Sequence, residues 1–140
     1  MNKKTIIGYT TGVFDLFHIG HLNIFINAKK YCDYLIVGVT TDEITKTVKN
    51  KYPVIPFEER IQIVRSIKFV DEAVAKDNLS FEYAWEKYKF NLMIKGDDWK
   101  DTSKGDKLEE ELYKYNVKVI YLPYTKHTSS TLLKSILEKL

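Results

Sequence analysis

The chain has 140 residues, of which 44% are hydrophobic and 29% charged, and this balance predicts one globular domain over residues 1–140. The formal net charge of +3 suits an anionic small molecule and is too small to indicate a nucleic-acid partner. No stretch reaches the roughly 20 apolar residues of a transmembrane helix. The apolar run near the start of the sequence is also too short for a signal peptide. With a single cysteine, Cys32, that is expected to be buried, we predict a cytoplasmic protein without membrane insertion.

Strand-like and helix-like patterns alternate along the chain. Apolar, β-branched runs indicate strands, and apolar residues at helical spacing indicate helices. In chain order the patterns predict a strand at 5–10, a helix at 19–31, a strand at 34–40, a helix at 56–67, a strand at 72–75, a helix at 81–89, a strand at 91–95, a helix at 108–115, a strand at 117–122 and a helix at 129–140. The basic stretch with Lys46, Lys49 and Lys51 is interrupted by prolines and is interpreted as a loop.

This alternation predicts an α/β fold, Rossmann-like and doubly wound, with a five-stranded, mostly parallel sheet and helices on both faces. The first two strands are apolar on both faces, as a sheet covered on both sides requires. In such sheets ligands bind at the carboxyl ends of the strands. Polar stretches follow the first, fourth and fifth strands, at residues 10–21, 96–101 and 123–131. We therefore expect these three stretches to form one site.

The first of these stretches contains "GVFDLFHIGH", with His18 and His21 three positions apart at the start of a helix. A helix N-terminus has unpaired N–H groups and a partial positive charge, and it binds phosphate readily. Gly12 and Gly20 allow the backbone to approach a ligand, and two imidazoles can donate hydrogen bonds to phosphate oxygens. The alternative is two unrelated histidines, one of them in the core. A metal site is not indicated, because no third ligand has suitable spacing and His127 is far away.

The same string resembles the H-x-G-H signature of the cytidylyltransferase family, within the HIGH nucleotidyltransferase superfamily. Further matches cover nearly the whole chain: "TTDE" at 40–43, "EER" at 58–60, "IKFVDEAV" at 67–74, "KGDDW" at 95–99 and "PYTKHTSST" at 123–131. The resemblance implies that CTP and an alcohol phosphate react to give a CDP-alcohol and pyrophosphate. It also implies in-line attack without a covalent enzyme intermediate, Mg²⁺ as cofactor, and a homodimer.

Carried over by position, the resemblance implies catalytic roles for His18, His21, Lys49 and Asp15. Asp15 would order the site, or else be a local Asx turn or helix cap. The implied nucleotide-binding residues are Thr10, Thr11, Gly12, Val13, Phe14, Gly20, Arg60, Gly96, Asp97, Asp98, Thr125, Ser129, Ser130 and Thr131. Candidates for contact with the acceptor or a phosphate are Lys46, Lys68 and Tyr124.

Some of these residues have alternative roles. Arg60 can instead form a surface ion pair with Glu58 or Asp71. The adjacent carboxylates of residues 97 and 98 can recognise the cytosine or ribose, or hold Mg²⁺ through water. Trp99 can stack on a ligand, although a core position is favoured.

The acceptor is the least determined part of the interpretation. "GDDW" resembles glycerol-3-phosphate cytidylyltransferases, whereas Val13 is typical of choline- and ethanolamine-phosphate enzymes. Tyr124, His127 and Lys68 also depart from the glycerol-3-phosphate pattern. Glycerol 3-phosphate is the favoured acceptor, giving CDP-glycerol for a cell-surface polymer. Phosphocholine, phosphoethanolamine, an adenylyltransferase that uses ATP, and a non-catalytic nucleotide-binding module are the alternatives.

Overall fold

A computed structural model of the chain describes residues 4–123 and 130–139. A five-stranded sheet lies at the centre, in the order β3-β2-β1-β4-β5, and every neighbouring pair of strands is parallel. The strands are β1 (Ile7–Gly12), β2 (Tyr34–Thr40), β3 (Glu72–Lys76), β4 (Leu92–Gly96) and β5 (Lys118–Leu122). The helices of the described residues are α1 (Ile19–Ala28), α2 (Asp42–Lys49), α3 (Phe57–Arg65), α4 (Phe81–Tyr88), the 3-10 helix η1 (Asp97–Trp99), α5 (Ser103–Tyr113) and α6 (Ser130–Glu138).

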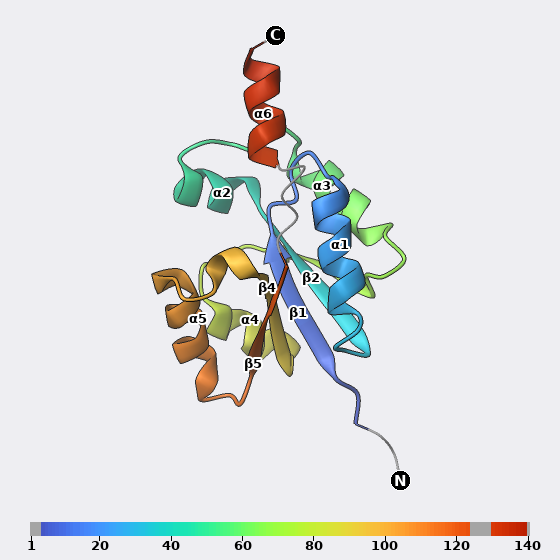
Figure 1. The fold of residues 1–140 in the computed structure, drawn as a ribbon, viewed down its shortest axis with the longest axis vertical. Coiled ribbons are helices and arrows are strands. Elements are labelled where there is room, and N and C mark those ends of the chain that lie inside the picture. Colours follow the sequence, from blue (N-terminus) through green and yellow to red (C-terminus); the bar gives the residue numbers. More distant parts are fainter. Residues whose placement is uncertain (1–3, 124–129, 140) are drawn as a thin grey trace.

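Two layers of helices cover the two faces of the sheet (Figure 1). On one face, Phe25 of α1 and Val64 of α3 pack in a buried cluster with Val37. On the other face, Leu108 and Leu112 of α5 pack with Tyr9, Ile36 and Met93. Neighbouring residues of β2, such as Ile36 and Val37, therefore point into different cores, as the twofold period of a strand requires. The predicted doubly wound α/β fold is confirmed.

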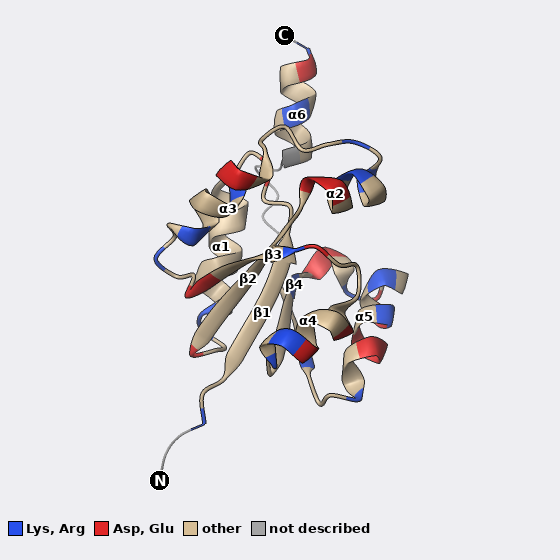
Figure 2. Ribbon diagram, turned by 180° about the vertical axis from the view of Figure 1, so that it is seen from behind, with Lys and Arg blue, Asp and Glu red and all other residues tan. Residues whose placement is uncertain are grey.

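The strand order places the site at one end of the sheet. The chain leaves β1 toward β2 on one side, and β4 lies on the other side of β1. Such a reversal of strand order opens a crevice at the carboxyl ends of the two central strands. Figure 1 shows α2 and α6 beyond this end of the sheet. Charged residues lie mainly on the helices and loops, and the strands carry few of them (Figure 2).

The loop predicted around Lys46 and Lys49 is wrong, because both residues lie on α2. The side chain of Thr41 accepts a hydrogen bond from the Ile44 backbone and caps this helix, and acidic residues occupy its first turn. Asn50 ends it in the left-handed conformation, with φ of 59°. The helical pattern of α2 was missed because Pro53 and Pro56 follow it, and the loop predicted from these prolines began too early in the sequence.

Other predicted boundaries differ from the structure by a few residues. The first strand begins two residues later than predicted and ends at Gly12. Helix α5 begins at Ser103 rather than 108, because the Thr102 hydroxyl accepts a hydrogen bond from the Gly105 N–H and caps it. Across residues 4–123 and 130–139, no helix is long and apolar enough to cross a bilayer.

Candidate functional site

A hollow of about 360 Å³ lies at the carboxyl ends of β1 and β4. Its walls come from the loop after β1, from helices α1, α2 and α6, and from the end of β4. The lining residues are Thr10, Thr11, Gly12, Val13, Phe14, Asp15, His18, Gly20, His21, Ile24, Lys49, Lys95, Gly96, Asp98, Trp99, Thr131 and Lys134. A larger groove of about 710 Å³ lies on the α4 and α5 side. Trp99 lines both this groove and the smaller hollow. The smaller hollow is the candidate site, because residues of the first two polar stretches line it together with Thr131, the one lining residue from the described part of the third.

His18 and His21 form the N-terminus of α1 and are held by the backbone. His18 Nδ1 accepts the Gly20 N–H at 3.0 Å, and His21 Nδ1 accepts the His18 N–H at 3.3 Å. The two rings stack with their centroids 3.9 Å apart. Because each Nδ1 is an acceptor, the proton of each neutral ring resides on Nε2. The capping therefore leaves two Nε2–H donors beside the positive end of the helix dipole.

Both imidazoles are neutral near pH 7. Burial lowers the pKa of His21 to about 3, with His18 and Lys49 lowering it further and Asp15 opposing them. Burial also lowers the pKa of His18. His21 packs against the rings of Phe14 and Phe17, with centroid distances of 5.3 and 5.2 Å. The alternative of a core histidine is therefore partly correct for His21. One side of its ring packs in the aromatic cluster, and the residue also lines the hollow.

The pKa of His21 gives a testable expectation for the unliganded protein. Its imidazole carbon resonances in a ¹H–¹³C NMR titration should stay constant from pH 8 to pH 5. The folded ring takes a proton only at about pH 3, whereas an unfolded chain takes it at about 6.5. The free energy of unfolding that His21 contributes is thus fully present above pH 6.5 and falls as the pH is lowered toward 3. A titration midpoint above pH 5 would contradict this environment.

The loop after β1 has a strained backbone. Phe14 and Leu16 are in the left-handed region, with φ of 53° and 50°. A Cβ on Gly12 would lie 2.9 Å from the Phe14 ring, so glycine is needed for this ring to fold back on the strand end. Phe14 is buried and packs on Phe25 with a centroid distance of 5.2 Å. Such conformations cost about 1–3 kcal/mol each, and the surrounding core holds them in place.

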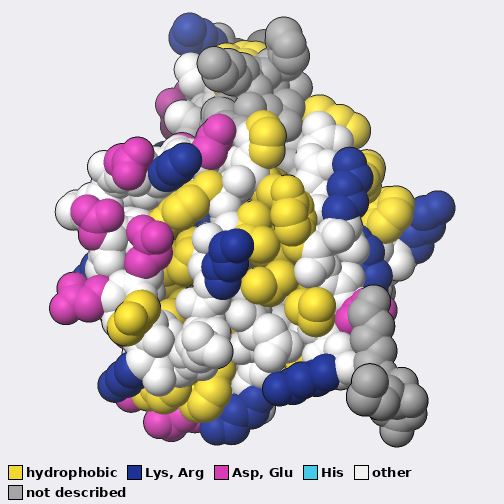
Figure 3. Space-filling view, turned by 60° about the horizontal axis from the view of Figure 1, so that its bottom comes forward, with side chains coloured by type: hydrophobic (Ala, Val, Ile, Leu, Met, Phe, Trp, Pro, Cys, Tyr) yellow, Lys and Arg dark blue, Asp and Glu magenta, His cyan; other side chains and the backbone are white. Residues whose placement is uncertain are grey.

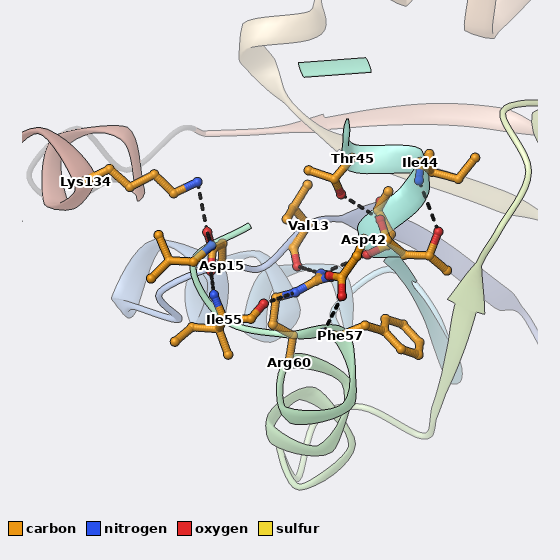
Figure 4. A network of polar contacts seen from close by, with 12 residues as sticks. Val13, Asp15, Asp42, Ile44, Thr45, Ile55, Phe57, Arg60 and Lys134 are labelled. Carbon is orange, nitrogen blue, oxygen red and sulfur yellow. Dashed lines mark hydrogen bonds and ion pairs between the residues drawn. The ribbon is translucent and has the colours of Figure 1, made fainter. Parts of the chain in front are cut away.

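Asp15 ties distant segments to this loop. Its side chain is only 2% exposed, and it accepts the N–H groups of Val54 at 2.8 Å and Ile55 at 2.9 Å. Lys134 of α6 forms an ion pair with it at 2.9 Å (Figure 4). Burial raises the pKa of Asp15, but Lys134 and the two backbone N–H groups outweigh it and the pKa is lowered. The predicted alternative of a local turn or helix cap is wrong, because these partners are far away in the sequence.

Arg60 is buried beneath the loop and does not line the hollow. Its guanidinium donates to the backbone carbonyls of Ile55 at 2.8 Å, Val13 at 2.6 Å and Thr40 at 2.8 Å. It also forms an ion pair with Asp42 at 2.6 Å (Figure 4). The predicted surface ion pair with Glu58 or Asp71 is wrong, because the guanidinium is buried and pairs with Asp42. The predicted nucleotide contact stays a prediction, and the protein contacts of Arg60 support a positioning role. Every donating nitrogen of this side chain has a protein partner.

Three lysines line the hollow: Lys49, Lys95 and Lys134. Burial lowers the pKa of Lys49, and the like charges of Lys134 and Lys104 lower it further. The predicted phosphate contacts of Lys46 and Lys68 are not supported by their positions. Lys46 donates to the Asn50 carbonyl at 3.2 Å, and exposed Lys68 lies over the Phe69 ring.

Comparison with known proteins gives this geometry a context. The family model described as cytidylyltransferase-like matches residues 9–136. The chain belongs to the cytidylyltransferase-like family. It is 34% identical over 139 residues to the glycerol-3-phosphate cytidylyltransferase of Bacillus subtilis strain 168, covering 94% of this chain and 95% of that protein. It is 38% identical over 133 residues to the same enzyme of Bacillus spizizenii, with the same coverage. The chain is accordingly a nucleotidyltransferase, and the resemblance drawn from the sequence is confirmed.

A solved structure supports the fold independently. The lipopolysaccharide core biosynthesis protein of Thermoplasma volcanium superposes with a TM-score of 0.74 and 23% sequence identity. The match covers 89% of this chain and all of that protein. At this identity the similarity establishes only the shared α/β architecture.

Most of the cytidylyltransferase site residues that could be predicted from sequence come together at the hollow. Asp97 does not line it, although its neighbours Gly96 and Asp98 do. Tyr124, Thr125 and Ser129 lie outside the described residues, and Ser130 is described only as the first residue of α6.

Sequence reasoning missed Lys95, Lys134 and Ile24 as lining residues. Trp99 both lines the hollow and packs against the core, so its predicted core position is only half of its role. A lysine at the end of an apolar strand is the signal by which Lys95 could have been found. No comparable signal marks Lys134, whose helix was predicted from its apolar stripe.

Proposed function

We propose that this enzyme transfers CMP from CTP to glycerol 3-phosphate, giving CDP-glycerol and pyrophosphate. The observation that carries the proposal is the pair of Nε2–H donors of His18 and His21 at the N-terminus of α1, inside a hollow that also holds Lys49. Glycerol-3-phosphate cytidylyltransferases of three bacteria are 32–38% identical to the chain and match 94% of it. We propose that this product serves the synthesis of a cell-surface polymer.

In the proposed reaction an oxygen of the acceptor phosphate attacks the α-phosphorus of CTP. A new P–O bond forms while the bond to the β-phosphate bridging oxygen breaks, and pyrophosphate leaves with that electron pair. The Nε2–H groups of His18 and His21 donate to the α-phosphate oxygens, where negative charge develops. Lys49 neutralises the departing phosphates. The site thus acts by positioning and charge stabilisation, which is what phosphoryl-type transfer chiefly needs.

Mg²⁺ enters this proposal together with the nucleotide. Within the described part of the chain, no group of three His, Cys, Asp or Glu side chains is placed to hold a metal ion. The two carboxylates that line the hollow are Asp15, which is bound by Lys134 and two backbone N–H groups, and Asp98. Mg²⁺ commonly uses one or two carboxylates and substrate phosphates, so Asp98 with the CTP phosphates fits it. Bound there, the ion would neutralise phosphate charge.

The direct test is pyrophosphate release by the purified protein with CTP, Mg²⁺ and one acceptor at a time. Glycerol 3-phosphate, phosphocholine and phosphoethanolamine form the panel, and CDP-glycerol should be the preferred product. Faster turnover with either amine-bearing acceptor would overturn the acceptor assignment. No pyrophosphate with any acceptor would argue against cytidylyl transfer.

ATP is the alternative nucleotide, because the chain is also 34% identical over 125 residues to the FAD synthase of Thermococcus onnurineus. A ligand that binds only the folded protein raises its melting temperature. CTP should therefore stabilise the protein and ATP should not. Stabilisation by ATP alone would replace the cytidylyl assignment by adenylyl transfer.

Lys49 and Lys51 give a matched pair of substitutions. Lys49→Ala should raise the KM for CTP by about tenfold, because a charge-assisted phosphate contact contributes about 1.5–3 kcal/mol. Lys51→Ala should leave it within about twofold, since both lysines are exposed but only Lys49 lines the hollow. Steady-state kinetics with varied CTP would measure both. The reverse order would assign the phosphate contact to Lys51.

We further propose a cytoplasmic homodimer. Two surfaces support an interface between copies. Figure 3 shows hydrophobic side chains gathered in the middle of one face of the molecule. On α6, which projects from the domain in Figure 1, Leu132, Ile136 and Leu137 are 46–51% exposed. Sedimentation velocity should give the mass of two chains at micromolar concentration, and a single species of 16.4 kDa would overturn the dimer.

A further inference from the structure

Lys95, the residue before "GDDW", places an ionisable amine in the interior. Its side chain is 8% exposed and lines the hollow at the end of β4. Nζ donates to the Thr11 hydroxyl at 3.3 Å and lies 3.8 Å from the centre of the Trp99 ring. The ion pairs found among the described residues all involve other cations. The ammonium group therefore rests on a neutral hydroxyl and an aromatic face, without a carboxylate partner in that part of the chain.

Such an arrangement is costly without a ligand. Burial opposes the charge on Lys95 and lowers its pKa to about 7, and the like charge of Lys76 adds to this effect. The carboxylate of Asp98 only partly offsets them. Buried charges in proteins are normally paired, so a buried lysine that lines a hollow and has no carboxylate partner among residues 4–123 and 130–139 indicates an anion that enters the hollow.

The position of Lys95 separates it from the histidine pair. Lys95 lies with Phe81 and Trp99, which pack on the cluster beneath α4 and α5. His21 lies with Phe14 and Phe17, which belong to the cluster beneath α1 and α3. The hollow thus has cationic or donor groups from both faces of the sheet. Two substrates that each carry phosphate need separate positive groups, because their charges repel as the reacting atoms approach.

We propose that Lys95 binds the phosphate of the acceptor, with the Thr11 hydroxyl as a second donor, while the histidine pair and Lys49 bind the nucleotide phosphates. The inference rests on the proposed function and names the subsite of its second substrate. The ligand class is a phosphomonoester. Its phosphate would be held at the end of β4, facing an α-phosphate at the N-terminus of α1.

Lys95→Met is the decisive variant, because methionine is also long and unbranched but carries no charge. The KM for glycerol 3-phosphate should rise by about tenfold or more, since one charge-assisted contact is lost. The Kd for CTP, measured by calorimetry without acceptor, should stay within about twofold, and the melting temperature should not fall, because a buried charge is removed. Lys104→Met is the matched control. Its Nζ lies 5.8 Å from the same Trp99 ring, but the residue does not line the hollow, so neither constant should change.

Three results would overturn the assignment. A weakened Kd for CTP with an unchanged acceptor KM would place Lys95 at the nucleotide, and two unchanged constants would make it structural. Calorimetry with glycerol 3-phosphate alone separates this inference from the proposed reaction. If the native protein binds glycerol 3-phosphate but releases no pyrophosphate from CTP, the proposed function fails and loss of that binding in Lys95→Met still supports the subsite. If the native protein binds no phosphomonoester, with or without CTP, the subsite itself is refuted.

Discussion

His18→Asn should lower kcat by about a hundredfold and leave the Kd for CTP within a few fold, as expected for loss of one donor to a developing oxyanion. Asparagine separates the two roles of this histidine, which are capping α1 and donating a hydrogen bond into the hollow. Its Oδ1 can replace Nδ1 as acceptor of the Gly20 N–H, so the cap of α1 is kept. It has no group at the position of Nε2. Pre-steady-state turnover together with calorimetry of CTP binding would measure the two effects separately.

Glutamine at the same position is the matched control. Its amide nitrogen can lie near the place of Nε2, so His18→Gln should recover part of the lost kcat while weakening the cap. His21→Asn should behave like His18→Asn, because its Nδ1 also accepts a backbone N–H and its Nε2 also carries the free donor. Melting temperatures would show whether the folded state is intact in each variant.

Equal losses in CTP affinity and turnover would contradict this assignment. The histidines would then bind the ground state and the transition state uniformly. Unchanged turnover in both asparagine variants would make the stacked rings a structural cap of α1 without a catalytic role. The neutral state of His21 already limits the choices, since a ring with a pKa of about 3 donates hydrogen bonds at pH 7 without carrying a charge.

The sequence was sufficient to predict the architecture because the strands are short apolar runs separated by helical patterns. Ile36 and Val37 are buried in different cores, and a run that is apolar on both faces predicts this directly. The convergence of the first and fourth strand ends on one hollow also followed from the parallel order. Helix α2 was missed because its capping signal, Thr41 before Asp42 and Glu43, is short and precedes a proline-interrupted basic stretch.

The contacts that hold the site together could not be predicted in the same way. Arg60 bonds carbonyls 47 residues before it at Val13 and 20 residues before it at Thr40. Neither partner is marked by its side-chain type, because any residue offers a backbone carbonyl. Lys95 similarly meets the Thr11 hydroxyl, 84 residues away in the sequence, and the Phe81 ring only through tertiary packing.

These long-range contacts form one connected support beneath the histidine loop. Ile55 donates its N–H to Asp15 and accepts a hydrogen bond at its carbonyl from Arg60. Arg60 also donates to the carbonyl of Val13, two residues before Asp15. The loop is therefore held at two residues, Val13 and Asp15 (Figure 4). Asp15 extends the support to α6 through Lys134. The strained φ values at Phe14 and Leu16 are held by this arrangement, since their neighbours cannot shift independently.

Arg60→Met should cause the largest loss of stability of any substitution considered. It leaves three backbone carbonyls without their guanidinium donor and Asp42 without its ion-pair partner. Breaking a buried charged network by removing one partner costs about 3–5 kcal/mol. For a domain of this size that corresponds to a fall in melting temperature of roughly 10–17 °C. Urea unfolding would measure the free energy, and Arg65→Met, at an exposed position on the same helix, is the control.

Lysine should not rescue position 60, because one ammonium group cannot reach acceptors that a planar guanidinium spans with three nitrogens. Arg60→Lys should therefore lose nearly as much stability as Arg60→Met. The alternative role, direct contact with the nucleotide, predicts a different pattern. In that case Arg60→Lys would fold with native stability and fail only in CTP affinity. Arg60 is 1% exposed, and its donating nitrogens bond Ile55, Val13, Thr40 and Asp42. We therefore expect both substitutions to lower activity indirectly, because the histidine loop loses its support. The loss of activity should follow the loss of stability.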